Sequence, residues 1–231
     1  MLAQQQFYKP ISIILVAVLL LFPYSVGAVT QTVTTDADDD SYVPGFGWSS
    51  VVFTPDFLLQ GNASGLDFKL ALRFQNTVVE QGVTISSATL RLYYESGSAA
   101  FVGTLYGNDV DDASAWSGSV IPSSVTKTTA SASMTVPSVS FLDPVDFDVT
   151  DIVQEIVNRG GWASGNALAI VGDVAGVTAE DGRSFFSREG SFTEVSDYSL
   201  APVLIIETAS APARVLRLKG GTRLMNGARL R

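Results

Sequence analysis

A cluster of aspartates near the start of the chain is the group of side chains best suited to bind a metal ion. Its four members lie within five residues: Asp36, Asp38, Asp39 and Asp40. Calcium takes about six to eight oxygen ligands, which carboxylates on a loop can supply. The spacing is not that of an EF-hand, because no Gly is sixth and no Glu twelfth from Asp36. The cluster therefore predicts either a structural Ca²⁺ site or a solvated acidic loop, and Asp109, Asp111 and Asp112 carry the same two interpretations.

Aromatic side chains form the second group that can bind a ligand, since a flat apolar face stacks on a sugar ring. Tyr42 and Trp48 follow the acidic cluster in a Gly- and Pro-containing stretch, and Trp116 lies in a Ser/Thr-rich stretch expected to be a long connection or weakly paired edge strands. We take these three residues as the candidate ligand platform. Large aromatic residues are also common core anchors and loop plugs, so this alternative stays open for each of them.

The chain lacks two residue types on which much enzyme chemistry depends, because it contains no His and no Cys. Ser-His-Asp and Cys-His nucleophile systems are thereby excluded, and a zinc or copper site would lack its commonest ligands. A glycosidase needs two carboxylates at a set separation, and no pair among the 23 acidic residues is singled out by the sequence. We therefore expect a non-catalytic protein with Ca²⁺ as its one candidate cofactor.

Charge is divided unevenly along the chain. Residues 214–231 hold six basic and no acidic residues, whereas residues 29–213 hold all 23 acidic residues and seven basic ones, a net charge of −16. An acidic body argues against nucleic acid as a ligand and suits cations, although acidity also simply keeps a protein soluble.

The basic tail contains a six-residue repeat in which Arg217, Arg223 and Arg229 each precede a Leu. So short a repeat cannot form a solenoid alone, so the tail is either disordered or docks on another surface. Its strand-like alternation would let it add to a sheet edge, and its charge would steer it to the acidic body of another copy. As a third alternative, the tail is a secretion-sorting or surface-attachment signal, or its six positive charges bind anionic lipid or cell-wall polymer.

An apolar run at residues 11–22 follows Lys9 and precedes the small residues Gly27 and Ala28, as in a secretory signal peptide cut before Val29. The run is short for a bilayer span, and an uncleaved anchor is the alternative. We expect a signal peptide at 1–28, one domain at 29–208, and a linker with the basic tail at 209–231. The mature chain would carry no membrane span and would be secreted or held at the cell surface.

Short alternating runs separated by Gly, Pro, Asn and Asp predict an all-β, antiparallel sandwich. The clearest strands are 68–74 and 88–94, in which every second residue is apolar, and further strands are expected at 102–106, 167–171, 184–186 and 203–206. One short amphipathic helix is expected at about 150–159, because apolar residues recur at helical spacing, Thr150 can cap its start and Gly160 follows its end.

Three segments carry a family resemblance: KLALRF at 69–74, GVTISSATLRLY at 82–93 and FDVTDIVQE at 147–155. Together with Tyr42-Val43, Ser187-Arg188-Glu189 and PVLIIE at 202–207, they make residues 34–207 resemble the DNRLRE-type domain. The resemblance implies a jelly-roll-like β-sandwich related to carbohydrate-binding modules, with the Ser-Arg-Glu segment as a turn. The stretch that ends at Trp116 matches the family's Trp-led middle segment only loosely.

Two functions are compatible with these features. The first is a secreted, non-catalytic module that binds polysaccharide or cell-surface glycan, or acts in adhesion, with Ca²⁺ as a structural ion. The second is a self-associating subunit of an extracellular fibre, appendage or surface coat, which assembles through the C-terminal tail.

Overall fold

The computed structural model describes residues 28–32, 39–42, 57–63, 66–97, 101–117, 120–136, 138–173 and 182–209. The predicted signal peptide up to Gly27 and the basic tail lie outside these ranges. Within them, no helix is long and apolar enough to cross a membrane.

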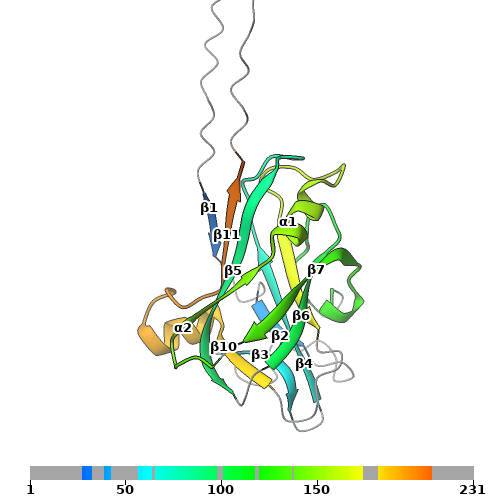
Figure 1. Ribbon diagram of the computed structural model, residues 1–231. Helices are drawn as coiled ribbons and strands as arrows, with labels where there is room; N and C mark the ends of the chain where they lie inside the picture. The colour runs from blue at the N-terminus through cyan, green and yellow to red at the C-terminus, as the bar shows by residue number, and fades with distance from the viewer. Residues whose placement is uncertain are drawn as a thin grey trace, which may run out of the picture. The chain divides into compact units, whose positions relative to one another are not determined.

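The described chain is mostly antiparallel β-structure, which confirms the expected all-β class (Figure 1). The strands are β1 (Val29–Thr32), β2 (Asp39–Tyr42), β3 (Phe57–Ala63), β4 (Leu66–Phe74), β5 (Ile85–Gly97), β6 (Phe101–Asn108), β7 (Lys127–Val136), β8 (Pro144–Asp148), β9 (Leu168–Asp173), β10 (Gly182–Phe186) and β11 (Val203–Thr208). The helices of the described residues are α1 (Thr150–Val157), α2 (Arg188–Val195) and the 3₁₀ turn η1 (Pro122–Ser124).

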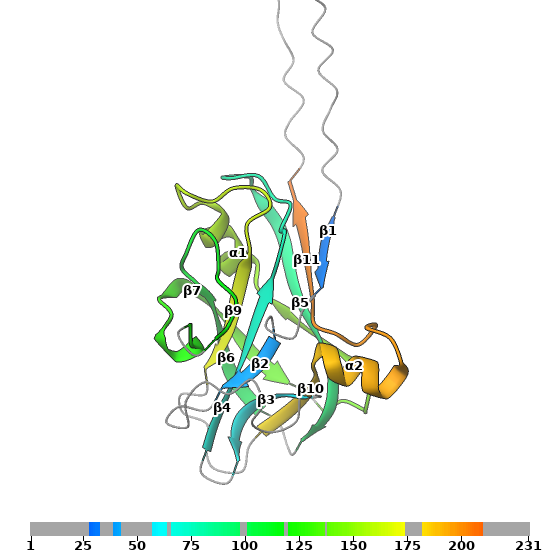
Figure 2. The same cartoon turned by 180° about the vertical axis from the view of Figure 1, so that it is seen from behind.

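The strands form two packed layers (Figures 1 and 2). One layer contains β1, β11, β5 and β8, and the other contains β2, β4, β9, β6 and β7. Strands β10 and β3 join them, because β10 pairs with β5 on one side and with β3 on the other, and β3 pairs with β4. The sandwich expected from the sequence is therefore present, with hydrogen bonds that continue from one layer into the other.

The alternating runs read from the sequence supply the core between the layers. Leu90 and Leu92 of β5 are fully buried, whereas Arg91 between them is not, and the same alternation places Leu72 and Phe74 of β4 in the core. Successive side chains of a strand point to opposite faces, so each strand contributes one apolar row. The strand predictions at 68–74 and 88–94 are confirmed.

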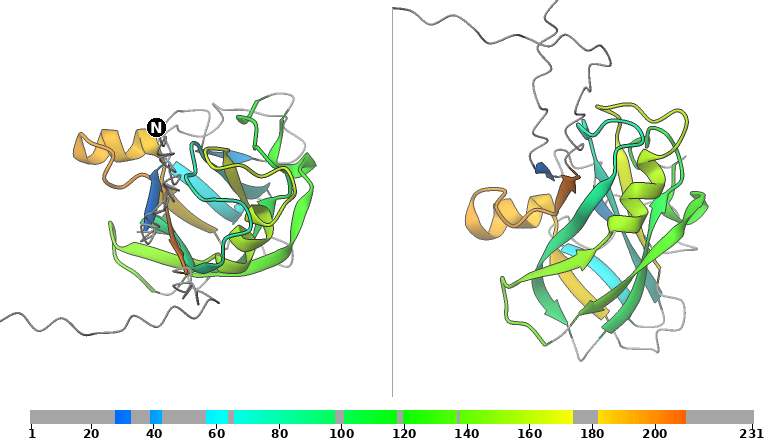
Figure 3. Two further views of the ribbon diagram at one scale, coloured as in Figure 1. Left: turned by 90° about the horizontal axis from the view of Figure 1, so that it is seen from above. Right: turned by 45° about the horizontal axis from the view of Figure 1, so that its top comes forward.

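Helix α1 closes one end of the core between β5 and β7 (Figure 3). Its apolar face, which includes Ile152 and Ile156, is buried as predicted. Gly107 of β6 lies under it, because a Cβ there would come within 2.8 Å of Ile152 and 2.7 Å of Ile156. The expected Thr150 cap is wrong: Val149 is the N-cap residue and makes no side-chain cap hydrogen bond.

A further expectation needs correction. Helix α1 is not the sole helix of the described chain, because Ser187-Arg188-Glu189, expected to be a turn, starts α2; the Ser187 hydroxyl accepts a hydrogen bond from the Gly190 N–H at 3.0 Å. For the Ser/Thr-rich stretch around Trp116, the edge-strand alternative holds: the stretch contains the ten-residue strand β7, which among the described strands pairs with β6 alone.

Candidate functional site

The first predicted metal cluster lies only partly within the described chain. Asp39 and Asp40 belong to β2, where they pair with Leu72 and Ala71 of β4, so this part of the cluster is a strand and not a loop. Asp36 and Asp38 lie outside the described residues, as do the side chains of the β2 residues. Among the residues that are described, no group of three or more acidic side chains could hold a metal ion. The calcium site stays a prediction.

The second carboxylate group makes contacts within the protein. Arg159 donates hydrogen bonds to Asp109 and to Asp111 Oδ1, the latter at 2.7 Å, and these carboxylates raise the pKa of the guanidinium. The Asp112 carboxylate accepts the Ala167 backbone N–H at 2.8 Å. The three aspartates therefore fasten their loop to the segment between α1 and β9, which favours a structural role over ion binding.

Trp116 occupies a buried position and does not form a platform. It is 3% exposed in a second apolar cluster with Ala71, Ala169 and Val171, on the opposite face of the β4–β9 pair from the main core. Because the ring is covered, it presents no face to a sugar in this structure. Of the other two platform residues, the side chain of Tyr42 and the whole of Trp48 lie outside the described residues.

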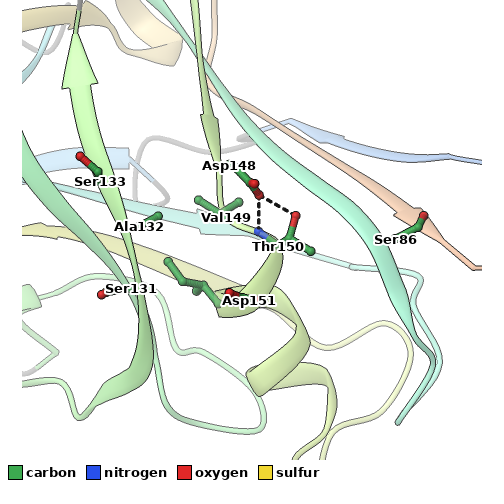
Figure 4. Close-up of a pocket in the computed structure, with 9 residues that line it drawn as sticks. Ser86, Ser131, Ala132, Ser133, Asp148, Val149, Thr150 and Asp151 are labelled. Atoms are coloured by element: carbon green, nitrogen blue, oxygen red, sulfur yellow. Dashed lines mark hydrogen bonds between the residues drawn. The ribbon is translucent and has the colours of Figure 1, made fainter.

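A hollow of about 500 Å³ opens between β7 and the start of α1 (Figure 4). Ser131 and Ser133 of β7 line one side, Ser86 of β5 lies on the other, and Asp148 and Thr150 lie between them (Figure 4). The remaining lining residues are Ala132, Val149, Asp151 and Ile152. The hollow thus combines hydroxyls and carboxylates with a small apolar floor.

The carboxylate at the centre of the hollow is held in its charged form. Asp148 Oδ1 accepts hydrogen bonds from the Thr150 hydroxyl at 2.6 Å and from the Thr150 N–H at 3.0 Å, and these bonds lower its pKa. The Thr150 hydroxyl in turn accepts the Ala88 N–H at 2.9 Å, which ties the start of α1 to β5. Asp151, in the first turn of α1, is exposed.

Strand edges border this hollow. Strand β7 pairs with β6 alone and β8 pairs with β5 alone among the described strands, so each has one side without a ladder partner. Glu155 of α1 covers one end of the β7 edge, because its carboxylate accepts the N–H groups of Thr129 and Ala130 at 2.8 and 2.7 Å. The β7 edge beyond Ala130 has no such cover within the described chain.

A second surface feature lies on α2 and the turn after it. Phe192 and Tyr198 stack with ring centroids 5.5 Å apart and an interplanar angle of 29°, and the Arg188 guanidinium lies 4.2 Å from the Tyr198 ring centroid. Phe192 is 54% and Tyr198 45% exposed, and Val195 beside them is exposed too. These residues form the α2 patch. The sequence does not predict it, because α2 buries only Gly190 and Ser191 and so has no apolar periodicity.

Arg183 of β10 is the most deeply buried cation of the described chain, at 5% exposure. Its guanidinium lies 5.3 Å from the Tyr94 ring centroid, and Nη1 donates to the Tyr94 hydroxyl at 3.0 Å and the Gly97 carbonyl at 3.2 Å. These contacts join β10 to β5 where the two layers meet.

Comparison with known proteins gives no family or relative. No protein-family model matches the chain, and no curated protein matches it. The resemblance to the DNRLRE-type domain therefore stays a prediction.

Proposed function

We propose that this protein is a non-catalytic binding module whose α2 patch binds carbohydrate. The exposed Phe192–Tyr198 stack carries the proposal. An exposed aromatic face buries apolar area against the C–H face of a sugar ring, and nearby polar groups bind the hydroxyls. Arg188 and its ion-pair partner Glu189, 3.1 Å away, supply such groups beside the rings.

The surface distribution of apolar side chains supports this choice of site. The described chain exposes five large apolar side chains: Val78, Phe141, Phe192, Val195 and Tyr198. Three of the five belong to the α2 patch. Clustered exposed apolar residues mark binding surfaces more often than single ones do. Secretion, jelly-roll-like connectivity, kinship with the DNRLRE-type domain and an adhesive role at the cell surface belong to the same proposal.

Binding to a broad panel of soluble and insoluble glycans tests the proposal. Phe192→Ala and Tyr198→Ala should each weaken binding about tenfold or more while leaving the circular dichroism spectrum unchanged. Val78→Ala is the matched control, since Val78 is 61% exposed and lies in the turn before β5. Binding that survives both aromatic substitutions, or no binding to any glycan on the panel, would refute the proposal.

A further inference from the structure

We infer that the hollow between β7 and the start of α1 receives the basic C-terminal tail, residues 214–231, of a second copy, which adds to the β7 edge as a strand. The inference is independent of glycan binding at the α2 patch. The hollow would be the surface on which one copy accepts the tail of the next. Three properties of the described residues support this inference.

The first property is the open edge itself. An unpaired strand edge presents N–H and C=O groups that an extended segment can pair with, and proteins usually cover or block such edges. Glu155 covers Thr129 and Ala130 alone, and no described strand pairs with the β7 edge from Ser131 to Val136. Strand β8, which ends at Asp148 in the hollow, has a second edge without a ladder partner in the described chain.

The second property is the two-sided chemistry of the hollow. Ser131, Ser133 and Asp148 lie on its outward side and are exposed. Ala132, Val149 and Ile152 form its inward floor and are partly or fully buried. A strand that enters the hollow must therefore carry one polar and one apolar row.

The tail sequence has this pattern. All four of its leucines stand at even positions: Leu216, Leu218, Leu224 and Leu230. Five of its six basic residues stand at odd positions: Arg217, Lys219, Arg223, Arg229 and Arg231. Since side chains of a strand alternate between faces, an extended tail would place leucines on one face and cations on the other. The leucines match the apolar floor, and the cations match Asp148 and Asp151, the two exposed carboxylates that line the hollow.

The third property is charge. Asp148 is held ionised by Thr150, and Asp151 lies beside it without an ion-pair partner in the described chain. The body of residues 29–213 carries −16 and the tail +6, so the two attract each other over a distance set by ionic strength. Assembly should therefore weaken as salt is added.

Light scattering and sedimentation of residues 29–231 test the inference. We expect concentration-dependent oligomers at low salt, a monomer when residues 214–231 are deleted, and dissociation by an excess of synthetic peptide 214–231. Asp151→Lys should weaken association about tenfold or more. Glu194→Lys makes the same charge change at an exposed position on α2 and should stay within about twofold of the parent chain.

The double substitution Leu218→Ser with Leu224→Ser tests strand addition separately, since it keeps every charge. It should also abolish association, because the apolar face of the tail is lost. A chain of monomer size at low salt overturns the inference. So does association that is lost on tail deletion but is unaffected by Asp151→Lys, or that survives the double Leu→Ser substitution.

Discussion

Asp173, at the end of β9, provides a sharp test of how charge stabilises this sandwich. Its carboxylate forms ion pairs with the ammonium group of Lys69 on β4, at 3.0 Å, and with that of Lys127 on β7. These pairs connect three strands of one layer. The side chain is 18% exposed, against 20% for Lys69 and 35% for Lys127. Replacing the carboxylate by an amide, Asp173→Asn, keeps the shape and removes the charge between two cations.

The size of the effect follows from the pKa of Asp173. Burial acts to raise this pKa, but hydrogen bonds and attraction from Lys127 and Lys69 outweigh it and lower the pKa from 3.8 to about 2. A difference of this size between the folded and unfolded states corresponds to about 2 kcal/mol of stability. Because the folded pKa is the lower one, this stability is fully present above pH 3.8 and is lost as the pH falls towards 2.

Urea unfolding of the parent chain and of Asp173→Asn between pH 2 and pH 7 measures this contribution. We expect the variant to be about 2 kcal/mol less stable at neutral pH, with the difference shrinking to near zero at about pH 2. Asp146→Asn is a matched control, because its partner Arg91 lies 2.7 Å away but the Asp146 side chain is 45% exposed, against 18% for Asp173. It should cost about 1 kcal/mol or less. A penalty for Asp173→Asn that does not change with pH would refute the reasoning.

Three further predictions concern packing and ions. Gly107→Ala should destabilise the fold by about 1–3 kcal/mol because the new Cβ would meet Ile156, whereas Gly160→Ala, with open space around it, should have little effect on the melting temperature. Trp116→Ala should cost about 3–5 kcal/mol of unfolding free energy while leaving the affinity for any glycan unchanged, and a selective loss of binding would contradict its core role. If the cluster that begins at Asp36 holds Ca²⁺, calcium at about 100 times its Kd should stabilise the chain by about 3 kcal/mol. Asp36→Asn should remove this stabilisation. Equal melting temperatures with calcium and with a chelator would exclude the site.

The parts of the fold that could be predicted are those in which side-chain contrast is strong. In β5, large apolar residues such as Leu90 and Leu92 alternate with Thr89 and Arg91, and the burial follows that order. In α1, the apolar residues recur at helical spacing and are buried together. In both elements the sequence pattern and the tertiary environment require the same conformation.

The elements whose positions the sequence did not predict have weak contrast between their inward and outward residues. Strand β7 does alternate, but its inward row includes Ala130 and Ala132, which differ little in hydrophobicity from the Ser and Thr of its outward row. Helix α2 buries only Gly190 and Ser191, so it shows no apolar periodicity, and its clearest signal was Ser187 as an N-cap. Such elements are held by neighbours distant in the sequence, which a local pattern does not reveal.

The candidate site was harder to predict than the fold for the same physical reason. Residue type left Trp116 as either a ligand platform or a core anchor, because its exposure depends on how the segment after β6 folds back over Ala169 and Val171 of β9. Phe192 and Tyr198 are ordinary aromatic residues in the sequence and become a patch because α2 and the following turn bring them within stacking distance. Whether an aromatic residue can bind a ligand is thus decided by what covers it.

The β7 edge without a ladder partner belongs to a strongly acidic part of the chain, residues 29–213. This combination would restrict which segments can pair with the edge. Exposed edges invite pairing with any extended chain, and charge is one means by which proteins prevent it. Asp148 and Asp151 at the hollow would repel an acidic strand from another body, and residues 29–213 supply every acidic residue of the chain. The tail at 214–231 combines six cations with no acidic residue, so the carboxylates that would repel acidic segments would favour this one.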